Sequence, residues 1–222
     1  MMQRYNYGHN FCNMNMSIRQ YVQYSAKQKE IKVSTVCKPI SAIRGMNAYE
    51  ILELCRQEES IPVDVTAILK KLGISSLAFD FSKIESQIPE CANGNHILGA
   101  LATKGDKAAI FYSVDDKKDS HRYRFTIAHE IGHCCLNHID TNKALPHLMF
   151  RKDGEANSKK EIAANIFAGE LLIPENSLMN MIDELLIPSV STLAEIFDVS
   201  DKVMLARLKY LKLKKKIVGY NC

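Results

Sequence analysis

Residues 124–138 read RFTIAHEIGHCCLNH. The five letters HEIGH constrain the possible structure of the chain more strongly than any other part of the sequence does. His129 and His133 are four residues apart, so on an α-helix their side chains share one face, with Cβ atoms about 5–6 Å apart. Two imidazoles at this spacing can reach one Zn²⁺ ion at about 2.0–2.1 Å. Glu130 lies one step around the helix, where its carboxylate can approach a water molecule on the metal. The pattern predicts a helix that carries a metal site.

A catalytic zinc site needs a third protein ligand and keeps its fourth position for water. Residues 159–172 have the spacing of a second helix, and four apolar side chains predict that it packs on the first: Ile162, Ile166, Phe167 and Leu171. Gly132 in the first helix also indicates that another element packs closely on it. Glycine destabilises a helix by about 1 kcal/mol relative to alanine, a cost that close packing would explain. Glu161 is then a candidate donor. Spacing alone leaves another interpretation open, since an acidic residue in the first turn also compensates the helix dipole.

Asn165 lies one turn after Glu161 and shares its face of the second helix. Its amide can orient a metal ligand from behind, or it can serve only in capping or packing.

His138 is five residues after His133, which on a continuous helix is about 140° around the axis, so we expect it to point elsewhere. We expect the other histidines at the surface or in ordinary polar contacts: His9, His96, His121 and His147. His147 and Tyr123 could stabilise an oxyanion, and the spacing selects neither.

The seven cysteines are an odd number and none lies in a CxxC pair, so a disulfide framework is not expected. Cys134 and Cys135 follow His133 directly, but adjacent helix residues point about 100° apart. We expect these two side chains to be small apolar parts of the core rather than zinc ligands.

The net charge of +4 is unevenly distributed. Residues 202–222 contain seven basic and no acidic residues, whereas residues 1–201 carry a net charge of −3. This tail could contact nucleic acid or an acidic partner. It could equally be the solvated end of the last helix, where cations suit the helix dipole.

Residues 191–211 have two helical runs around a short break at 198–200, like a helix-turn-helix, and Ser200 can cap the second run. The glycine that is usual in the turn of a DNA-reading pair is absent. Packing is therefore favoured over DNA recognition.

The remaining pattern predicts an α+β fold with a small antiparallel sheet. Helices are expected within 47–57 and 61–74, from Ser120 as N-cap to about residue 136, and over 159–172. Short strands are expected at 76–81, 96–103 and 107–114, and a long connection at 138–158.

No run approaches the roughly 18 apolar residues of a membrane span, and the first 25 residues lack a secretory signal. We expect a cytoplasmic protein.

RFTIAHEIGH, followed 28 residues after its second histidine by EIAANIFAGELLIP, resembles the ImmA/IrrE family of HExxH metallopeptidases. The downstream pattern of that family is matched by Glu161, Ala164, Asn165, Phe167, Ala168, Glu170, Leu171, Leu172 and Pro174. The resemblance covers residues 46–212 and is most specific over 120–174. It departs at Ser113, where the family often has asparagine, and at the two cysteines after His133, where leucines are usual.

This resemblance implies a mainly helical zincin-like metallopeptidase domain over 46–174, preceded by an N-terminal extension over 1–45. A C-terminal helical segment with a basic tail follows over 175–222. The resemblance also implies that Glu161 is the third zinc ligand beside His129 and His133, with Glu130 as the general base. One Zn²⁺ ion is expected, with Mn²⁺ or Fe²⁺ as alternatives.

The function implied is cleavage of a specific intracellular protein, most often a DNA-binding transcriptional repressor, in a family often linked with mobile elements and stress responses. A strand over 108–114 could align the extended substrate. The alternative is a non-catalytic regulator that binds DNA or protein through its helix-turn-helix-like segment, with the HEIGH helix purely structural. A toxin or a general protein degrader is a further interpretation.

Overall fold

The computed structural model describes residues 40–86, 88, 91–92, 94, 96–104, 107–115, 119–138, 147–151, 158–213 and 216–217 of the 222-residue chain, with only the backbone described over 147–151. All of them belong to one compact unit that spans 32–222. The first 39 residues of the expected N-terminal extension lie outside this description, as does His9.

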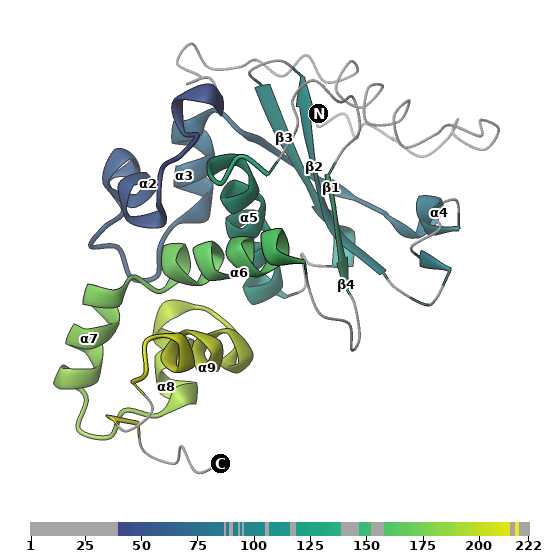
Figure 1. Cartoon of the computed structure of the whole chain (residues 1–222). Coiled ribbons are helices and arrows are strands. Elements are labelled where there is room, and N and C mark those ends of the chain that lie inside the picture. Colours follow the sequence, from purple (N-terminus) through teal and green to yellow (C-terminus); the bar gives the residue numbers. More distant parts are fainter. Residues whose placement is uncertain are drawn as a thin grey trace, which may run out of the picture. The chain divides into compact units, whose positions relative to one another are not determined.

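The described residues form a mixed α+β fold, as the sequence predicts (Figure 1). Its elements are η1 (Ile40–Ala42), α2 (Ala48–Cys55), α3 (Val65–Leu72), β1 (Ser75–Phe79), α4 (Ser82–Glu85), β2 (His96–Lys104), β3 (Lys107–Ser113), α5 (Ser120–Cys135), β4 (His147–Arg151), α6 (Lys159–Leu172), α7 (Glu175–Glu184), α8 (Val190–Phe197) and α9 (Asp201–Tyr210).

The sheet has four described strands in the order β1-β3-β2-β4. β2 and β3 form the expected antiparallel hairpin, in which Leu101 pairs with Ile110. β4 joins the other side of β2, also antiparallel, within a stretch where the sequence predicts only a connection. β1 departs from an all-antiparallel sheet, because it pairs in parallel with β3, with Leu77 opposite Phe111. The hairpin reverses the chain once between β2 and β3, so β3 returns in the direction of β1.

α5 packs against β2 and β3 on one side and against α6 on another, and Figure 1 shows α6 crossing in front of it. Ile127, Ala128 and Ile131 of α5 are fully buried. They belong to the same core as Leu171 and Leu172 of α6. The helix that carries HEIGH is therefore at the centre of the fold, held between sheet and helices.

Side-chain caps define where the helices begin. Asp119, rather than the predicted Ser120, caps α5: its carboxylate accepts the N–H of Arg122 at 3.2 Å. An aspartate in extended backbone is as good an N-cap as serine, and it is one residue earlier. Ser158 and Ser200 cap α6 and α9 in the same way, the latter as predicted.

The two C-terminal helices pack on the α5 region through a buried arginine. Arg124, which is 8% exposed, donates to the carbonyl oxygens of Val63, Phe197 and Asp198 at 2.8, 3.3 and 2.9 Å. Its Nε also lies 3.2 Å from the Asp198 carboxylate. Phe197 is itself fully buried in the main core. This embedding of the turn between α8 and α9 favours packing over DNA recognition for the helix-turn-helix-like segment.

Residues 40–45 also pack on the helical core. Ile40 and Ile43 are 4% and 2% exposed. The N–H of Gly45 donates to the carbonyl oxygen of Cys135 at 2.7 Å, which ties this segment to the end of α5.

Within the described part of the chain, no helix combines the length and the apolar character needed to cross a membrane.

Candidate metal centre

α5 buries all three polar residues of the HEIGH motif. His129, Glu130 and His133 are each 0% exposed. Because the two histidines are one turn apart, their Nε2 atoms approach to 2.9 Å, with the rings tilted by 61°. Two nitrogen donors therefore point to one place inside the fold.

α6 brings a carboxylate to the same place. Glu161 Oε2 lies 3.2 Å from His129 Nε2, and Oε1 lies 3.3 Å from His133 Nε2. One ligand atom from each of the three residues fits within 4.8 Å of the others. The Glu161 side chain is 26% exposed, against 0–1% for the histidines, so the cluster meets solvent on the side of Glu161.

The face that α6 turns to α5 differs in part from the predicted face. Phe167 and Leu171 are buried as expected, but Ile162 is 48% exposed, so its expected packing on α5 is wrong. On a helix, residue 162 lies about 160° from Ala164, which is fully buried and is part of the true contact face. The buried residues on this face include the small Ala164 and Ala168, where isoleucines were expected.

Asn165 holds the first histidine from behind. Its Oδ1 lies 2.9 Å from His129 Nδ1, which can donate its proton to the amide oxygen. A neutral imidazole with its proton on Nδ1 presents a lone pair at Nε2. That lone pair then faces the Glu161 carboxylate, another acceptor, at 3.2 Å. Such a contact needs a shared proton or a cation between the two groups, and the donor set fits a divalent metal ion in that place.

The separations of the donor atoms agree with this interpretation. Tetrahedral ligands at about 2.0–2.1 Å from a zinc ion lie about 3.3 Å from one another. The two Nε2 atoms are 2.9 Å apart, and each lies 3.2 or 3.3 Å from a different oxygen of Glu161. Two imidazoles and one carboxylate are also a ligand set that catalytic zinc sites use.

Glu130 lies on the side of α5 that meets the sheet. A Cβ built on Gly99 of β2 would be 3.4 Å from Glu130 Oε1 and 2.7 Å from Thr126 Cγ2. A bulge between β2 and β4 falls at this point, where the register shifts between Ile97 and Gly99. Only a residue without a side chain lets α5 come this close to the strand beside Glu130.

The two cysteines after His133 are buried, as predicted, at 2% and 0% exposure. Burial raises the pKa of the Cys134 thiol well above its ordinary value, and the neighbouring Cys135 and Glu130 add to the effect. Burial raises the pKa of Cys135 to about 12. Both side chains therefore stay neutral thiols near neutral pH, and neither belongs to the cluster of donor atoms.

His138 does not point away from the site, so the expectation for this residue is wrong. Its Nδ1 lies 3.1 Å from His133 Nδ1, with ring centroids 5.0 Å apart. The helical projection fails because α5 ends at Cys135 and Asn137 adopts a left-handed conformation at φ 55°. An asparagine shortly after a helix is the sequence signal for such a turn.

The other candidates with described side chains lie in contacts outside the cluster. His96 pairs with Glu85 and His121 with Asp198, each at 3.1 Å, in the polar contacts expected of them. The Tyr123 ring packs edge-on against Tyr112. His147 lies on β4, where only the backbone is described.

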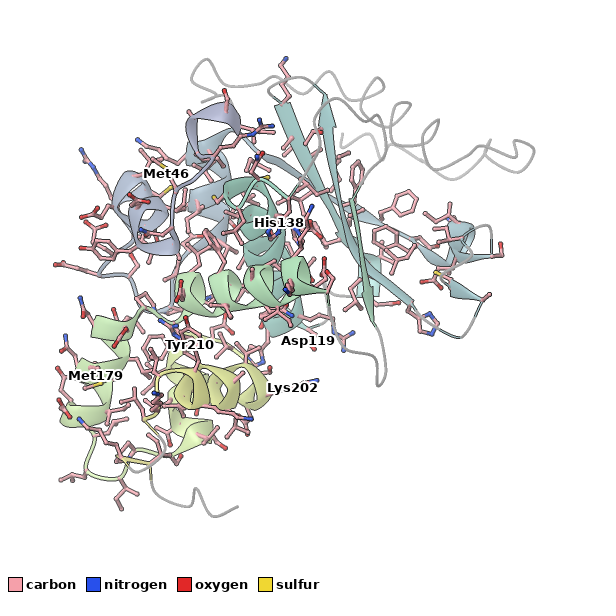
Figure 2. All side chains as sticks on the ribbon, viewed as in Figure 1. Met46, Asp119, His138, Met179, Lys202 and Tyr210 are labelled. Atoms are coloured by element: carbon pink, nitrogen blue, oxygen red, sulfur yellow. The ribbon has the colours of Figure 1, made fainter. Side chains whose placement is uncertain are left out.

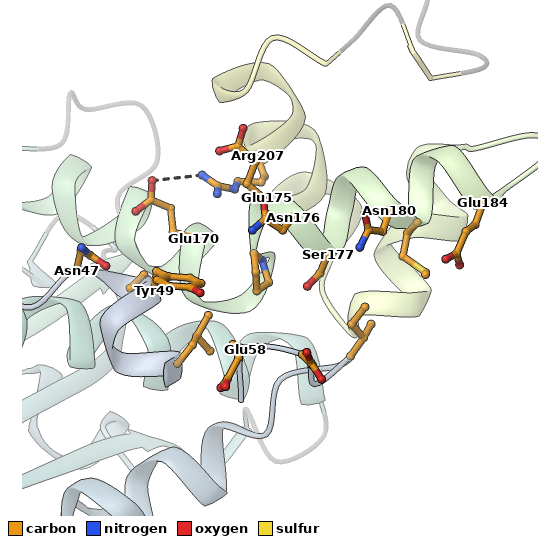
Figure 3. Close-up of a pocket in the computed structure, with 16 residues that line it drawn as sticks. Asn47, Tyr49, Glu58, Glu170, Glu175, Asn176, Ser177, Asn180, Glu184 and Arg207 are labelled. Carbon is orange, nitrogen blue, oxygen red and sulfur yellow. Dashed lines mark hydrogen bonds and ion pairs between the residues drawn. The ribbon is translucent and has the colours of Figure 1, made fainter. Parts of the chain in front are cut away.

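A separate cavity of about 730 Å³ lies among α2, the end of α6, α7 and α9 (Figure 3). Its lining is acidic and includes Glu58, Glu59, Glu170, Glu175 and Glu184. Arg207 reaches Glu170 at 3.4 Å and donates to the carbonyl oxygen of Ile173 at 3.1 Å. These contacts attach α9 to α6, and no residue of the metal cluster lines this cavity.

In a comparison with protein families, the model of peptidase M78, described as the IrrE N-terminal-like domain, matches residues 102–209. Comparison with curated proteins gives no match. The matched region includes α5, α6 and the C-terminal helices up to α9, and so crosses the domain boundary predicted at 174. It supports a metallopeptidase with a protein substrate. Residues 102–209 of this chain thus match the IrrE N-terminal-like domain of the M78 peptidase family.

Proposed function

We propose that this protein is a zinc-dependent endopeptidase, with His129, His133 and Glu161 as the metal ligands. The observation that carries the proposal is the convergence of their donor atoms from two helices to within 4.8 Å. Asn165 supports it, because the contact with His129 Nδ1 leaves the Nε2 lone pair for the metal. Mn²⁺ and Fe²⁺ are alternative ions, since the same donor types bind them.

Glu130 is the proposed general base. A bound Zn²⁺ would supply a water molecule whose pKa falls from about 15.7 toward 7, together with a Lewis acid for the peptide carbonyl. Glu130 accepts a proton at its carboxylate and returns it to the departing amine nitrogen, acting as base and then acid. Its complete burial and the close approach of Gly99 of β2 support this role, because they restrict the positions that the carboxylate can take.

The substrate backbone is proposed to lie along β4. The sequence-based hypothesis that β3 aligns the substrate is wrong, because β3 is hydrogen-bonded to β1 on one side and to β2 on the other. Among the described strands, β4 is the open edge next to β2, the strand that meets Glu130 at Gly99. An extended peptide can add to such an edge. Proline at alternate positions flanking the scissile bond should then lower kcat/KM, and equal tolerance at all positions would contradict the placement.

The target we propose is an intracellular DNA-binding regulator, cleaved in the cytoplasm. Support for this target comes from the resemblance of the sequence to the ImmA/IrrE family. The competing proposal is a regulator that acts only by binding, with a structural HEIGH helix. Against it stands the donor set itself, because burying two imidazoles that face a carboxylate has a desolvation cost that a bound metal ion would offset.

Replacement of Glu130 by Gln separates these two proposals. Wild-type protein and Glu130→Gln, both metal-loaded, are incubated with a peptide library made from the host proteome, and new termini are identified by mass spectrometry. The proposal predicts defined new termini with the wild type, none with the variant, and equal metal content in both. Identical new termini with both proteins would contradict the role of Glu130, and no new termini with either protein would favour the binding-only regulator.

A further inference from the structure

We propose that His138 is a positioning residue for the proposed metal ligand His133. The sequence pattern alone predicts that His138 points elsewhere. This inference rests on the proposed metal site. His133 can offer the lone pair of Nε2 toward the donor cluster only when its own proton is on Nδ1. That Nδ1 lies 3.1 Å from Nδ1 of His138, and the two rings are inclined by 67°. His138 Nδ1 therefore accepts the proton of His133, and His138 carries its own proton on Nε2.

The chain builds this contact from the end of α5. The N–H of His138 donates to the carbonyl oxygen of His133 at 3.1 Å, and the N–H of Asn137 donates to that of Cys134 at 3.4 Å. These two bonds, with the left-handed φ of 55° at Asn137, form a Schellman motif. The motif folds the chain back over the last turn and so returns the side chain of residue 138 to residue 133. In Figure 2, His138 lies at the far end of α5 from Asp119.

The helix α6 also contacts His138. Lys160 Nζ, in the first turn of α6, is 3.5 Å from the carbonyl oxygen of His138. α6 therefore contacts His138 at its N-terminal end, one residue before the third proposed ligand, Glu161. The turn that carries His138 therefore contacts both α5 and α6, the two helices that supply the donor cluster.

The result is a matched arrangement behind the two histidine ligands. Asn165 accepts from Nδ1 of His129 at 2.9 Å, and His138 accepts from Nδ1 of His133 at 3.1 Å. Such partners fix the tautomer and ring orientation of a ligand, and their removal lowers metal affinity by about 10–100-fold. His138 thus has a definite role without being a ligand.

The test measures Zn²⁺ affinity of the full-length protein by competition with a chromophoric chelator. His138→Ala removes the acceptor, and His138→Phe removes it while keeping a ring. His138→Asn is the rescue variant, because an asparagine Oδ1 occupies about the place of a histidine Nδ1. His121→Ala is the control, since His121 is a histidine of α5 that pairs with Asp198 and is not part of the donor cluster.

We expect the Ala and Phe variants to bind Zn²⁺ about 10–100-fold more weakly than the wild type, and the Asn and His121→Ala variants to bind within about threefold. The visible spectrum of the Co²⁺-loaded Ala variant should also differ from that of the wild type, whereas the Asn spectrum should not. Equal affinities of wild type, Ala and Phe overturn the inference, as does an Asn variant as weak as Ala. A wild type that binds no stoichiometric metal overturns the metal site itself, and this inference with it.

Discussion

Gly132 of α5 packs directly against the ring of Phe167 of α6. A Cβ at residue 132 would lie 3.1 Å from Cδ1 and 3.2 Å from Cβ of that phenylalanine. Such contacts are shorter than ordinary van der Waals packing, so glycine sets how closely the two helices cross. This crossing distance in turn sets how far Glu161 lies from the two histidines.

Gly132→Ala should therefore weaken Zn²⁺ binding more than it changes folding stability. The new methyl group pushes α6 outward, while alanine favours the helix by about 1 kcal/mol over glycine. We expect a loss of affinity of roughly tenfold or more and a change in unfolding free energy within about 1 kcal/mol. Chelator competition and urea unfolding measure the two quantities.

The paired variant Gly132→Ala with Phe167→Ala tests the cause. Alanine removes Cγ and Cδ1, two of the three atoms that the new methyl group would meet, so the Zn²⁺ affinity should recover toward that of Phe167→Ala alone. If the double variant binds no better than Gly132→Ala, the contact does not set the crossing distance.

Gly99→Ala should disturb Glu130 from the side of the sheet. The added Cβ would come 2.7 Å from Thr126 Cγ2, closer than real contacts allow, and the same Cβ would touch Glu130 Oε1. We expect an unfolding free energy lower by about 1–3 kcal/mol, as for other overpacked sites, and a fall in peptidase activity at unchanged metal content.

Thr126→Ser is the matched partner for this change, because serine lacks the methyl group that collides. In the Gly99→Ala background it should restore most of the stability. A Gly99→Ala protein as stable and as active as the wild type would show that the close approach of α5 to β2 has no role.

Arg124→Ala should be strongly destabilising. Its guanidinium is buried and serves three carbonyl oxygens and the Asp198 carboxylate, which would all lose this donor. Leaving a buried acceptor without its hydrogen bond costs about 1–3 kcal/mol, so the loss of three such bonds should lower the unfolding free energy by several kcal/mol, which urea unfolding can measure. Arg124→Lys should recover little, because an ammonium group cannot copy the fork of the guanidinium. Arg122→Ala, at a residue whose side chain is 41% exposed, is the control and should change stability by less than about 0.5 kcal/mol.

Alkaline pH should destabilise the fold through Cys135. Burial raises the pKa of this thiol from 9.0 to about 12, so the folded state disfavours the thiolate. The stabilisation is complete below pH 9, the ordinary thiol pKa, and is lost as the pH rises toward 12, by about 1.4 kcal/mol per pH unit. Urea unfolding of wild type and Cys135→Ala between pH 8 and 10.5 should show a smaller slope for the variant. Equal slopes would contradict the assigned burial of this thiol.

The sequence predicted the elements whose signals are local. Hydrophobic spacing and caps located α5, α6 and the β2–β3 hairpin. β4 was missed because its five residues lie within a polar connection, and its pairing with β2 depends on a partner about 50 residues earlier. The contact of His138 with His133 was missed because a helical projection ends where the helix ends. The face of α6 was only partly predicted, since alanines at a close helix crossing carry a weaker hydrophobic signal than the exposed Ile162.

The most direct measurement of the central claim is the Zn²⁺ content and affinity of purified wild type and Glu161→Gln, by elemental analysis and chelator competition. Glutamine keeps the size of the side chain and removes the charge that faces the two histidines. The account predicts one Zn²⁺ per wild-type chain and an affinity at least about 100-fold weaker for the variant. A wild type without stoichiometric metal, or a Glu161→Gln protein that binds as tightly as the wild type, would contradict it.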